Sequence, residues 1–171
     1  MYILKKVVFL DRDGVVNIDK SYVYKIDDFE FTKDLIKVLK HFLKLDYTLI
    51  IVTNQSGIGR GFYKLEDFKK LTKWMLEELK KFNIEIKKVY FCPHDPKEQC
   101  ECRKPHPKML LEAANEFNID LTNSWMIGDK ESDIEAAINA GINNTIFIGN
   151  KKTKAKFKVK SILDTIAIIK S

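Results

Sequence analysis

The segment VVFLDRDG, residues 7–14, joins a continuous apolar run to a cluster of charged residues. Val7 to Leu10 are all apolar, as in a strand that a parallel sheet buries on both faces. Asp11, Arg12 and Asp13 follow directly. Because ligands of open α/β sheets bind beyond the carboxyl ends of the strands, the segment predicts a buried strand that ends at a polar site.

Similar apolar runs occur along the rest of the chain and alternate with stretches of helical periodicity. The predicted strands are Val7–Leu10, Thr48–Val52, Val89–Phe91, Trp125–Ile127 and Ile146–Ile148. The predicted helices lie around residues 35–43, 68–79, 109–117 and 134–138, and Ser161 is placed to cap a last helix over Ile162–Ile169. This alternation predicts an α/β fold with a doubly wound, mainly parallel sheet.

Length and composition favour one soluble domain over residues 1–171. The chain has 171 residues, of which 45% are apolar and 32% charged, so intrinsic disorder is excluded as the main state. No stretch approaches the roughly 20 apolar residues that cross a bilayer, and the N-terminus carries no signal-peptide pattern. We therefore expect a cytoplasmic protein with no membrane partner.

The chain is basic, with 30 Lys and Arg against 24 Asp and Glu and a net charge of +6. This charge suits an anionic partner such as a phosphorylated metabolite, a nucleic acid or a membrane surface, although a solvated lysine-rich surface also explains it. Six of the lysines lie in Lys151–Lys160. Part of that segment is predicted as an edge strand with lysines facing water, and a nucleic-acid-binding stripe is the alternative.

Polar residues follow the other predicted strands as well, and parallel strands bring their carboxyl ends to one rim. Thr53 and Gln55 follow the second strand, and Asp129 follows the fourth. Asp11 and Asp13 are two residues apart, so in extended chain they share a face, and their mutual repulsion calls for a cation. Oxygen ligands of this kind suit Mg²⁺, with Asp129 as a further carboxylate. The alternative is that Asp11 or Asp13 merely caps a turn before Gly14.

All three cysteines lie within eleven residues of one another and beside a histidine, as Cys92, His94, Cys100 and Cys102. An odd number of cysteines excludes a closed disulfide framework. Four nitrogen and sulfur ligands make a complete tetrahedral set, which is typical of structural zinc. We expect this loop, residues 92–102, to fix the Arg103 and Lys104 that follow it.

These segments, in their order, resemble the four motifs of the haloacid dehalogenase (HAD) superfamily of phosphatases. The resemblance is carried by residues 9–17, residues 52–57, Lys104 and residues 128–133, and it runs from about Lys6 to Gly149. Within the superfamily, the chain is similar to the group that removes the C7 phosphate of heptose 1,7-bisphosphate, with histidinol-phosphate phosphatases as near relatives. The segments 14–31 and 82–104 leave no room for the cap domain that many HAD enzymes carry.

The resemblance implies a role for each matching residue. Asp11 would be the nucleophile that forms an aspartyl-phosphate, and Asp13 the acid and base. Thr53 would bind the transferring phosphoryl group, and Lys104 would balance its charge. Mg²⁺ would be held by Asp11, the main-chain carbonyl of Asp13, and Asp129.

The resemblance also implies a set of substrate contacts around an open cleft. They are Asp19, Lys20, Ser21, Tyr22, Asn54, Gln55, Ser56, Arg103, Lys104 and Lys130. The planar guanidinium of Arg103 can donate two parallel hydrogen bonds, which suits a second phosphate or a carboxylate. The expected protein is a monomeric, Mg²⁺-dependent phosphatase of a small phosphorylated sugar, with structural Zn²⁺ and no nucleic-acid partner. The alternatives are a histidinol-phosphate phosphatase, a polynucleotide 3′-phosphatase and a non-catalytic zinc module that binds nucleic acid.

Overall fold

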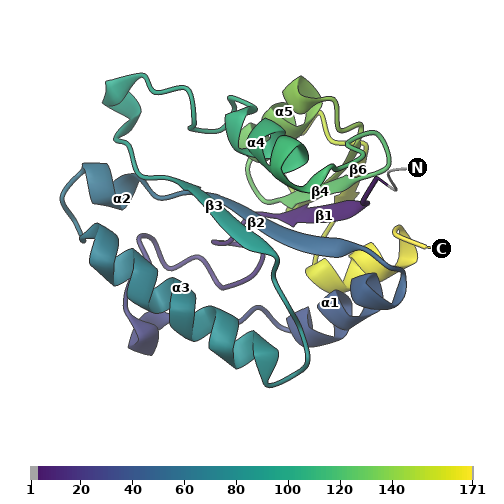
Figure 1. The fold of residues 1–171 in the computed structure, drawn as a ribbon, viewed down its shortest axis with the longest axis horizontal. Helices are drawn as coiled ribbons and strands as arrows, with labels where there is room; N and C mark the ends of the chain where they lie inside the picture. The colour runs from purple at the N-terminus through teal and green to yellow at the C-terminus, as the bar shows by residue number, and fades with distance from the viewer. Residues whose placement is uncertain (1–3, 171) are drawn as a thin grey trace.

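The computed structural model describes residues 4–170, which form one six-stranded sheet in the order β3-β2-β1-β4-β5-β6, with every neighbouring pair parallel (Figure 1). The strands are β1 Val7–Leu10, β2 Thr48–Asn54, β3 Lys88–Cys92, β4 Trp125–Gly128, β5 Asn144–Ile148 and β6 Phe157–Val159. The helices are α1 Leu35–Lys44, α2 Ser56–Gly59, α3 Leu65–Lys80, α4 Lys108–Phe117 and α5 Glu131–Ala140. Short 3₁₀ turns span η1 Ile26–Asp28, η2 Pro96–Glu98 and η3 Ile162–Ala167. The predicted doubly wound α/β fold is confirmed.

The order of the strands places β1 at the point where the sheet changes direction. From β1 the chain adds β2 and β3 on one side and β4 to β6 on the other. Leu10, the last residue of β1, pairs with Ile51 of β2 and Ile127 of β4. The carboxyl ends of these three strands therefore lie side by side, and this is where ligands bind in open α/β sheets.

Helices cover both faces of the sheet, with α4 and α5 on one side and α1 and α3 on the other (Figure 1). The four residues of β1 are fully buried and alternate between the two cores. Val8 and Leu10 pack in the core that includes α1 and α3, whereas Val7 and Phe9 pack in the core that includes α4 and α5. This two-sided burial explains why the strand is apolar throughout.

Several bounds differ from the sequence-based expectation: β3, β4 and β5 are one to two residues longer than predicted, and the short helix α2 was not predicted. The second strand extends to Asn54, so Thr53 and Asn54 belong to the strand itself. The last predicted helix is a 3₁₀ helix over Ile162–Ala167, in which the Thr165 hydroxyl donates to the Ile162 carbonyl at 2.6 Å. A side-chain hydroxyl that donates to a backbone carbonyl in this way competes with the backbone N–H that would bond to that carbonyl in an α-helix.

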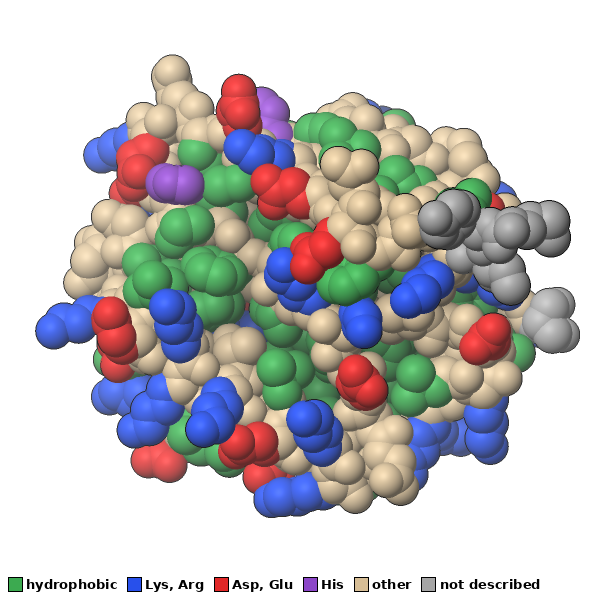
Figure 2. Space-filling view, in the orientation of Figure 1, with side chains coloured by type: hydrophobic (Ala, Val, Ile, Leu, Met, Phe, Trp, Pro, Cys, Tyr) green, Lys and Arg blue, Asp and Glu red, His purple; other side chains and the backbone are tan. Residues whose placement is uncertain are grey.

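The lysine-rich segment contributes the edge strand β6, as expected for part of it. Lys154 of this segment donates to Glu135 of α5 at 2.7 Å. In Figure 2, lysine and arginine side chains on the visible face are interspersed with acidic and apolar groups and form no continuous stripe. No helix within residues 4–170 is long and apolar enough to cross a membrane.

Candidate active site

The centre of the site is a buried lysine between two carboxylates. Lys104 Nζ lies 2.9 Å from Asp11 Oδ1 and 2.6 Å from Asp133 Oδ1, and it also donates to the Val52 carbonyl at 2.8 Å. Asp11 follows β1, Val52 belongs to β2 and Asp133 lies in the first turn of α5, after β4. The sheet therefore brings together residues that are far apart in the sequence, as the motif order predicts.

Burial controls the charges of this centre. It raises the pKa of Asp11, the Asp133 carboxylate raises it further, and the Lys104 ammonium opposes both. Burial alone would lower the pKa of Lys104, but Asp11 and Asp133 outweigh it and raise that pKa overall. Lys104 is therefore held as a cation between the two carboxylates.

A candidate cation site lies beside this lysine. Oxygens of Asp11, Asp129 and Asp133 all lie within 4.8 Å of one another. Asp129 Oδ1 is buried and has no hydrogen-bond partner among the residues that the structure describes. Gly14 has a φ of +92°, and a Cβ there would lie 2.1 Å from Asp129 Oδ2, so only glycine leaves room for this carboxylate. An unpartnered carboxylate oxygen among other carboxylates fits a hard divalent cation such as Mg²⁺.

Asp13 has a different environment from Asp11. Its carboxylate accepts from Arg12 Nη2 at 2.8 Å, from Asn17 Nδ2 at 3.1 Å and from Gln55 Nε2 at 3.0 Å. Burial alone would raise the pKa of Asp13, but Arg12 and the two amides lower it overall. Two carboxylates two residues apart thus have opposite pKa shifts, because their hydrogen-bond and charge partners differ.

Eight of the ten predicted substrate contacts line a cleft of about 280 Å³, which Asp13 also lines. The cleft is formed by Asp13, Asp19, Ser21, Tyr22, Asn54, Gln55, Ser56, Tyr63, Arg103, Lys130 and Ser132. Lys104 and Thr53 are buried and lie outside this lining, and Thr53 Oγ1 accepts from Gln55 Nε2 at 2.9 Å. Lys20 is also absent from the lining, because its ammonium pairs with Glu30 at 3.2 Å on the surface.

Asn54 holds the main chain of Lys104 as well as lining the cleft. Its Oδ1 accepts from the Lys104 N–H at 3.0 Å, and its Nδ2 donates to the Lys104 carbonyl at 3.2 Å. The paired bonds fasten the lysine's backbone to the end of β2. Asn54, which the sequence predicts as a substrate contact, therefore uses its side-chain amide to position Lys104.

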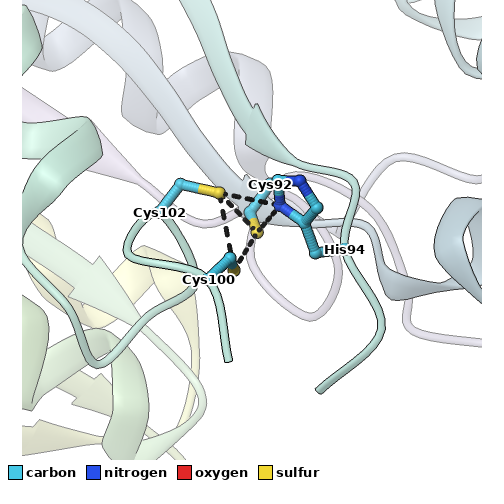
Figure 3. A group of neighbouring side chains, drawn as sticks. All are labelled: Cys92, His94, Cys100 and Cys102. Atoms are coloured by element: carbon cyan, nitrogen blue, oxygen red, sulfur yellow. Dashed lines mark hydrogen bonds between the residues drawn. The ribbon is translucent and has the colours of Figure 1, made fainter. Parts of the chain in front are cut away.

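The three cysteines and His94 point toward one another at the end of β3 (Figure 3). Cys92 Sγ lies 2.8 Å from Cys102 Sγ and 3.4 Å from Cys100 Sγ, and His94 Nδ1 lies 3.1 Å from Cys102 Sγ. The four ligand atoms all fall within 4.8 Å of one another, a set that could hold one zinc ion. Cys102 precedes Lys104 by two residues, so this loop leads directly into the buried centre.

The segment that begins the Cys/His cluster is also hydrogen-bonded to the backbone beside the cleft. The Gln55 N–H donates to the Cys92 carbonyl, and the Gly59 N–H donates to the Pro93 carbonyl, each at 2.8 Å. Gln55 and Gly59 stand at the two ends of α2, which borders the cleft. The Cys/His loop is therefore hydrogen-bonded to the backbone that carries the cleft residues. It also continues directly into the segment that carries Lys104.

Sequence reasoning missed two residues of the centre. Asp133 was included in the segment 128–133 that carries the resemblance but was given no role, although it lies four residues after Asp129 in the first turn of α5. Arg12 was assigned no role, yet it is 1% exposed and pairs with Asp13. A buried arginine could be foreseen only from its place between the two aspartates.

The fold and this site define a HAD-like phosphatase. A family model described as HAD-hydrolase-like matches residues 101–165. A Campylobacter jejuni protein named D-glycero-alpha-D-manno-heptose-1,7-bisphosphate 7-phosphatase is 52% identical over 152 residues, covering 89% of this chain and 87% of that protein. The chain belongs to the heptose-1,7-bisphosphate 7-phosphatase family of HAD enzymes.

Two further relatives agree with this assignment. A Helicobacter pylori protein (strain 26695) named D-glycero-beta-D-manno-heptose-1,7-bisphosphate 7-phosphatase is 47% identical over 169 residues, covering 96% of this chain and 98% of that protein. The crystal structure of a heptose 1,7-bisphosphate phosphatase from B. bronchiseptica, complexed with magnesium and phosphate, superposes with a TM-score of 0.86 at 26% identity. It covers 95% of this chain and 97% of its own.

Proposed function

We propose that the protein removes the C7 phosphate of D-glycero-D-manno-heptose 1,7-bisphosphate in a Mg²⁺-dependent reaction through an aspartyl-phosphate on Asp11. The observation that carries the proposal is the buried Asp11–Lys104–Asp133 centre together with the open polar cleft that Asp13 lines. Relatives that carry this activity in their names share 52% and 47% of their aligned residues with the chain.

In the first half of the reaction, a carboxylate oxygen of Asp11 attacks phosphorus, and the C7 oxygen of the sugar leaves. The protonated form of Asp13 gives its proton to that oxygen, and the carboxylate that results takes a proton from the water that hydrolyses the aspartyl-phosphate. Lys104 and Thr53 hold the phosphoryl oxygens in place. Asp11, Asp129 and the Asp13 carbonyl would hold Mg²⁺, which would supply neutralisation of the phosphoryl charge, and Asp133 lies close enough to support the same ion.

The remote part of the substrate would lie in the cleft. Arg103 lines the cleft, and its Nη1 is buried without a hydrogen-bond partner among the described residues. Lys130 also lines the cleft, and its Nζ lies 3.4 Å from Asp19 Oδ2. A guanidinium and an ammonium that line the same cleft suit the second phosphate of a sugar bisphosphate.

The Cys92–His94–Cys100–Cys102 set would bind one structural Zn²⁺, because three thiolates and an imidazole leave no ligand position for water. We further propose that the enzyme acts as a cytoplasmic monomer of a single domain, on a small phosphorylated sugar and not on nucleic acid. Size-exclusion chromatography with light scattering tests the monomer.

A panel of phosphate esters tests the activity. The purified protein is assayed with Mg²⁺ on both anomers of heptose 1,7-bisphosphate, on histidinol phosphate and on an oligonucleotide with a 3′-phosphate. We expect kcat/KM for one heptose anomer to exceed the other values by at least tenfold, and Asp11→Asn to abolish turnover while the protein stays folded. A preference for histidinol phosphate or the oligonucleotide would overturn the proposal.

A further inference from the structure

The side-chain amide of Gln55 connects Asp13 and Thr53 to the buried Tyr63 by hydrogen bonds. Its Nε2 donates to Asp13 Oδ2 at 3.0 Å and to Thr53 Oγ1 at 2.9 Å, and its Oε1 accepts from the Tyr63 hydroxyl at 2.6 Å. Gln55 is 3% exposed and Tyr63 6% exposed. Both amide hydrogens and the amide oxygen are therefore engaged within the protein.

The orientation of this amide is fixed from both sides. Nε2 donates to both Asp13 Oδ2 and Thr53 Oγ1, so Oε1 faces away from both and must meet a donor. Tyr63 supplies that donor, and burial raises the pKa of Tyr63 to about 12, which keeps the phenol protonated. If the hydroxyl were removed, Oε1 would be buried without a partner. The amide would then gain by turning toward water in the cleft, away from Asp13.

The ring of Tyr63 is itself held in place. It stacks on the ring of Tyr24 with centroids 5.1 Å apart and planes 8° from parallel. A Cβ on Gly57 would lie 2.1 Å from Tyr63 Cε1, so the ring occupies space that a side chain at position 57 would fill. The hydroxyl is thus presented to Gln55 by a ring with packed neighbours on two sides.

We propose that Tyr63 is a positioning residue of the phosphatase, which acts through Gln55 to hold Asp13 in the orientation that protonates the leaving oxygen. The inference rests on the proposed function, because it takes the acid–base role of Asp13 from it. Its distinctive consequence is selectivity for the leaving group. Loss of this orientation slows the release of a sugar alkoxide, which needs a proton, more than the release of 4-nitrophenolate, which leaves without one.

The experiment compares Tyr63→Phe with Tyr24→Phe, which removes the same atom from the stacked ring. The Tyr24 hydroxyl makes no hydrogen bond to any residue in the described range. For Tyr63→Phe we expect kcat/KM to fall about fivefold on heptose 1,7-bisphosphate, the effect of one hydrogen bond, and less than about twofold on 4-nitrophenyl phosphate. Tyr24→Phe is expected to change neither value more than about twofold. Equal losses on the two substrates, or no loss, would overturn the inference.

A double-mutant cycle tests whether Tyr63 acts through Gln55. In a Gln55→Leu background, Tyr63→Phe is expected to have no further effect, whereas losses that multiply would contradict the inference. Should Tyr63→Phe fail to fold, Gly57→Ala displaces the ring and must produce the same selective loss. A wild-type protein without activity on heptose 1,7-bisphosphate refutes the proposed function instead, and the comparison is then made on the ester it does hydrolyse.

Discussion

Asp133→Asn tests the charge balance of the buried centre. In the native protein, Oδ1 of Asp133 accepts from Lys104 Nζ at 2.6 Å, and Oδ2 accepts from the Lys130 N–H at 3.1 Å. Asparagine has one acceptor oxygen, so either orientation of its amide places an NH₂ group against a donor. The substitution therefore removes both a charge and a hydrogen bond from a residue that is 1% exposed.

The size of the effect follows from these contacts. Removing one partner of a buried ion pair costs about 3–5 kcal/mol. Lys104 retains Asp11 at 2.9 Å, so we expect a smaller loss of unfolding free energy, about 2–3 kcal/mol. In a domain of this size that loss lowers the Tm by roughly 4–12 °C. Displacement of the Lys104 ammonium from its place beside Asp11 should also lower kcat about 10- to 100-fold.

Thermal melts and steady-state kinetics at saturating Mg²⁺ measure both effects. Glu135→Gln is the matched control, since Glu135 lies on the same helix and pairs with Lys154 at 2.7 Å on the surface. An exposed pair contributes little, so this variant should keep the Tm and kcat of the wild type. If Asp133→Asn melts at the same temperature as Glu135→Gln, the reasoning from the buried ion pair is refuted.

Three further perturbations address the other parts of the site. Asp13→Asn should bind Mg²⁺ normally but lose far more kcat/KM on sugar phosphates than on 4-nitrophenyl phosphate, because kcat/KM reports the step in which the leaving group departs; an equal loss of kcat/KM on both would exclude leaving-group protonation by Asp13. Cys100→Ser should lower the zinc content, measured by elemental analysis, together with the Tm, and an unchanged zinc-to-protein ratio would rule out the four-ligand site. Burial and Asp133 raise the pKa of Asp11 above its usual 3.8. In the metal-free protein, the contribution of Asp11 to the free energy of unfolding is therefore present at low pH and is lost as pH rises through the raised pKa. A bound cation removes that loss, so Mg²⁺ should raise the Tm more at pH 8 than at pH 5, and a larger rise at pH 5 would contradict the assigned pKa direction.

Much of the sheet could be predicted because β1 and its neighbours are buried on both faces, which leaves continuous apolar runs in the sequence. The polar site was predictable for a related reason. Parallel strands align their carboxyl ends, so Asp11, Thr53 and Asp129 had to meet at one rim once the strands were correct. The Cys/His set was recognisable from its ligand types alone, and all four ligand atoms do converge.

What could not be predicted depends on side-chain packing between segments. Lys20 and Ser21 are adjacent in the sequence, but only Ser21 lines the cleft, because the Lys20 ammonium turns to Glu30. Tyr63 lies in a stretch with no motif, and its contact with Gln55 depends on the path of the chain after α2. Pairings of this kind leave no periodic signal in the sequence.

The central claim is that Asp11 attacks phosphorus and carries the phosphoryl group. It is tested most directly by mixing the enzyme with heptose 1,7-bisphosphate and Mg²⁺, quenching within one turnover and reducing with borohydride, which converts an aspartyl-phosphate to homoserine. Peptide mass mapping should find homoserine at position 11 and nowhere else, and only when substrate and Mg²⁺ are both present. Homoserine at another aspartate, or unmodified Asp11 under conditions of rapid turnover, would contradict the account.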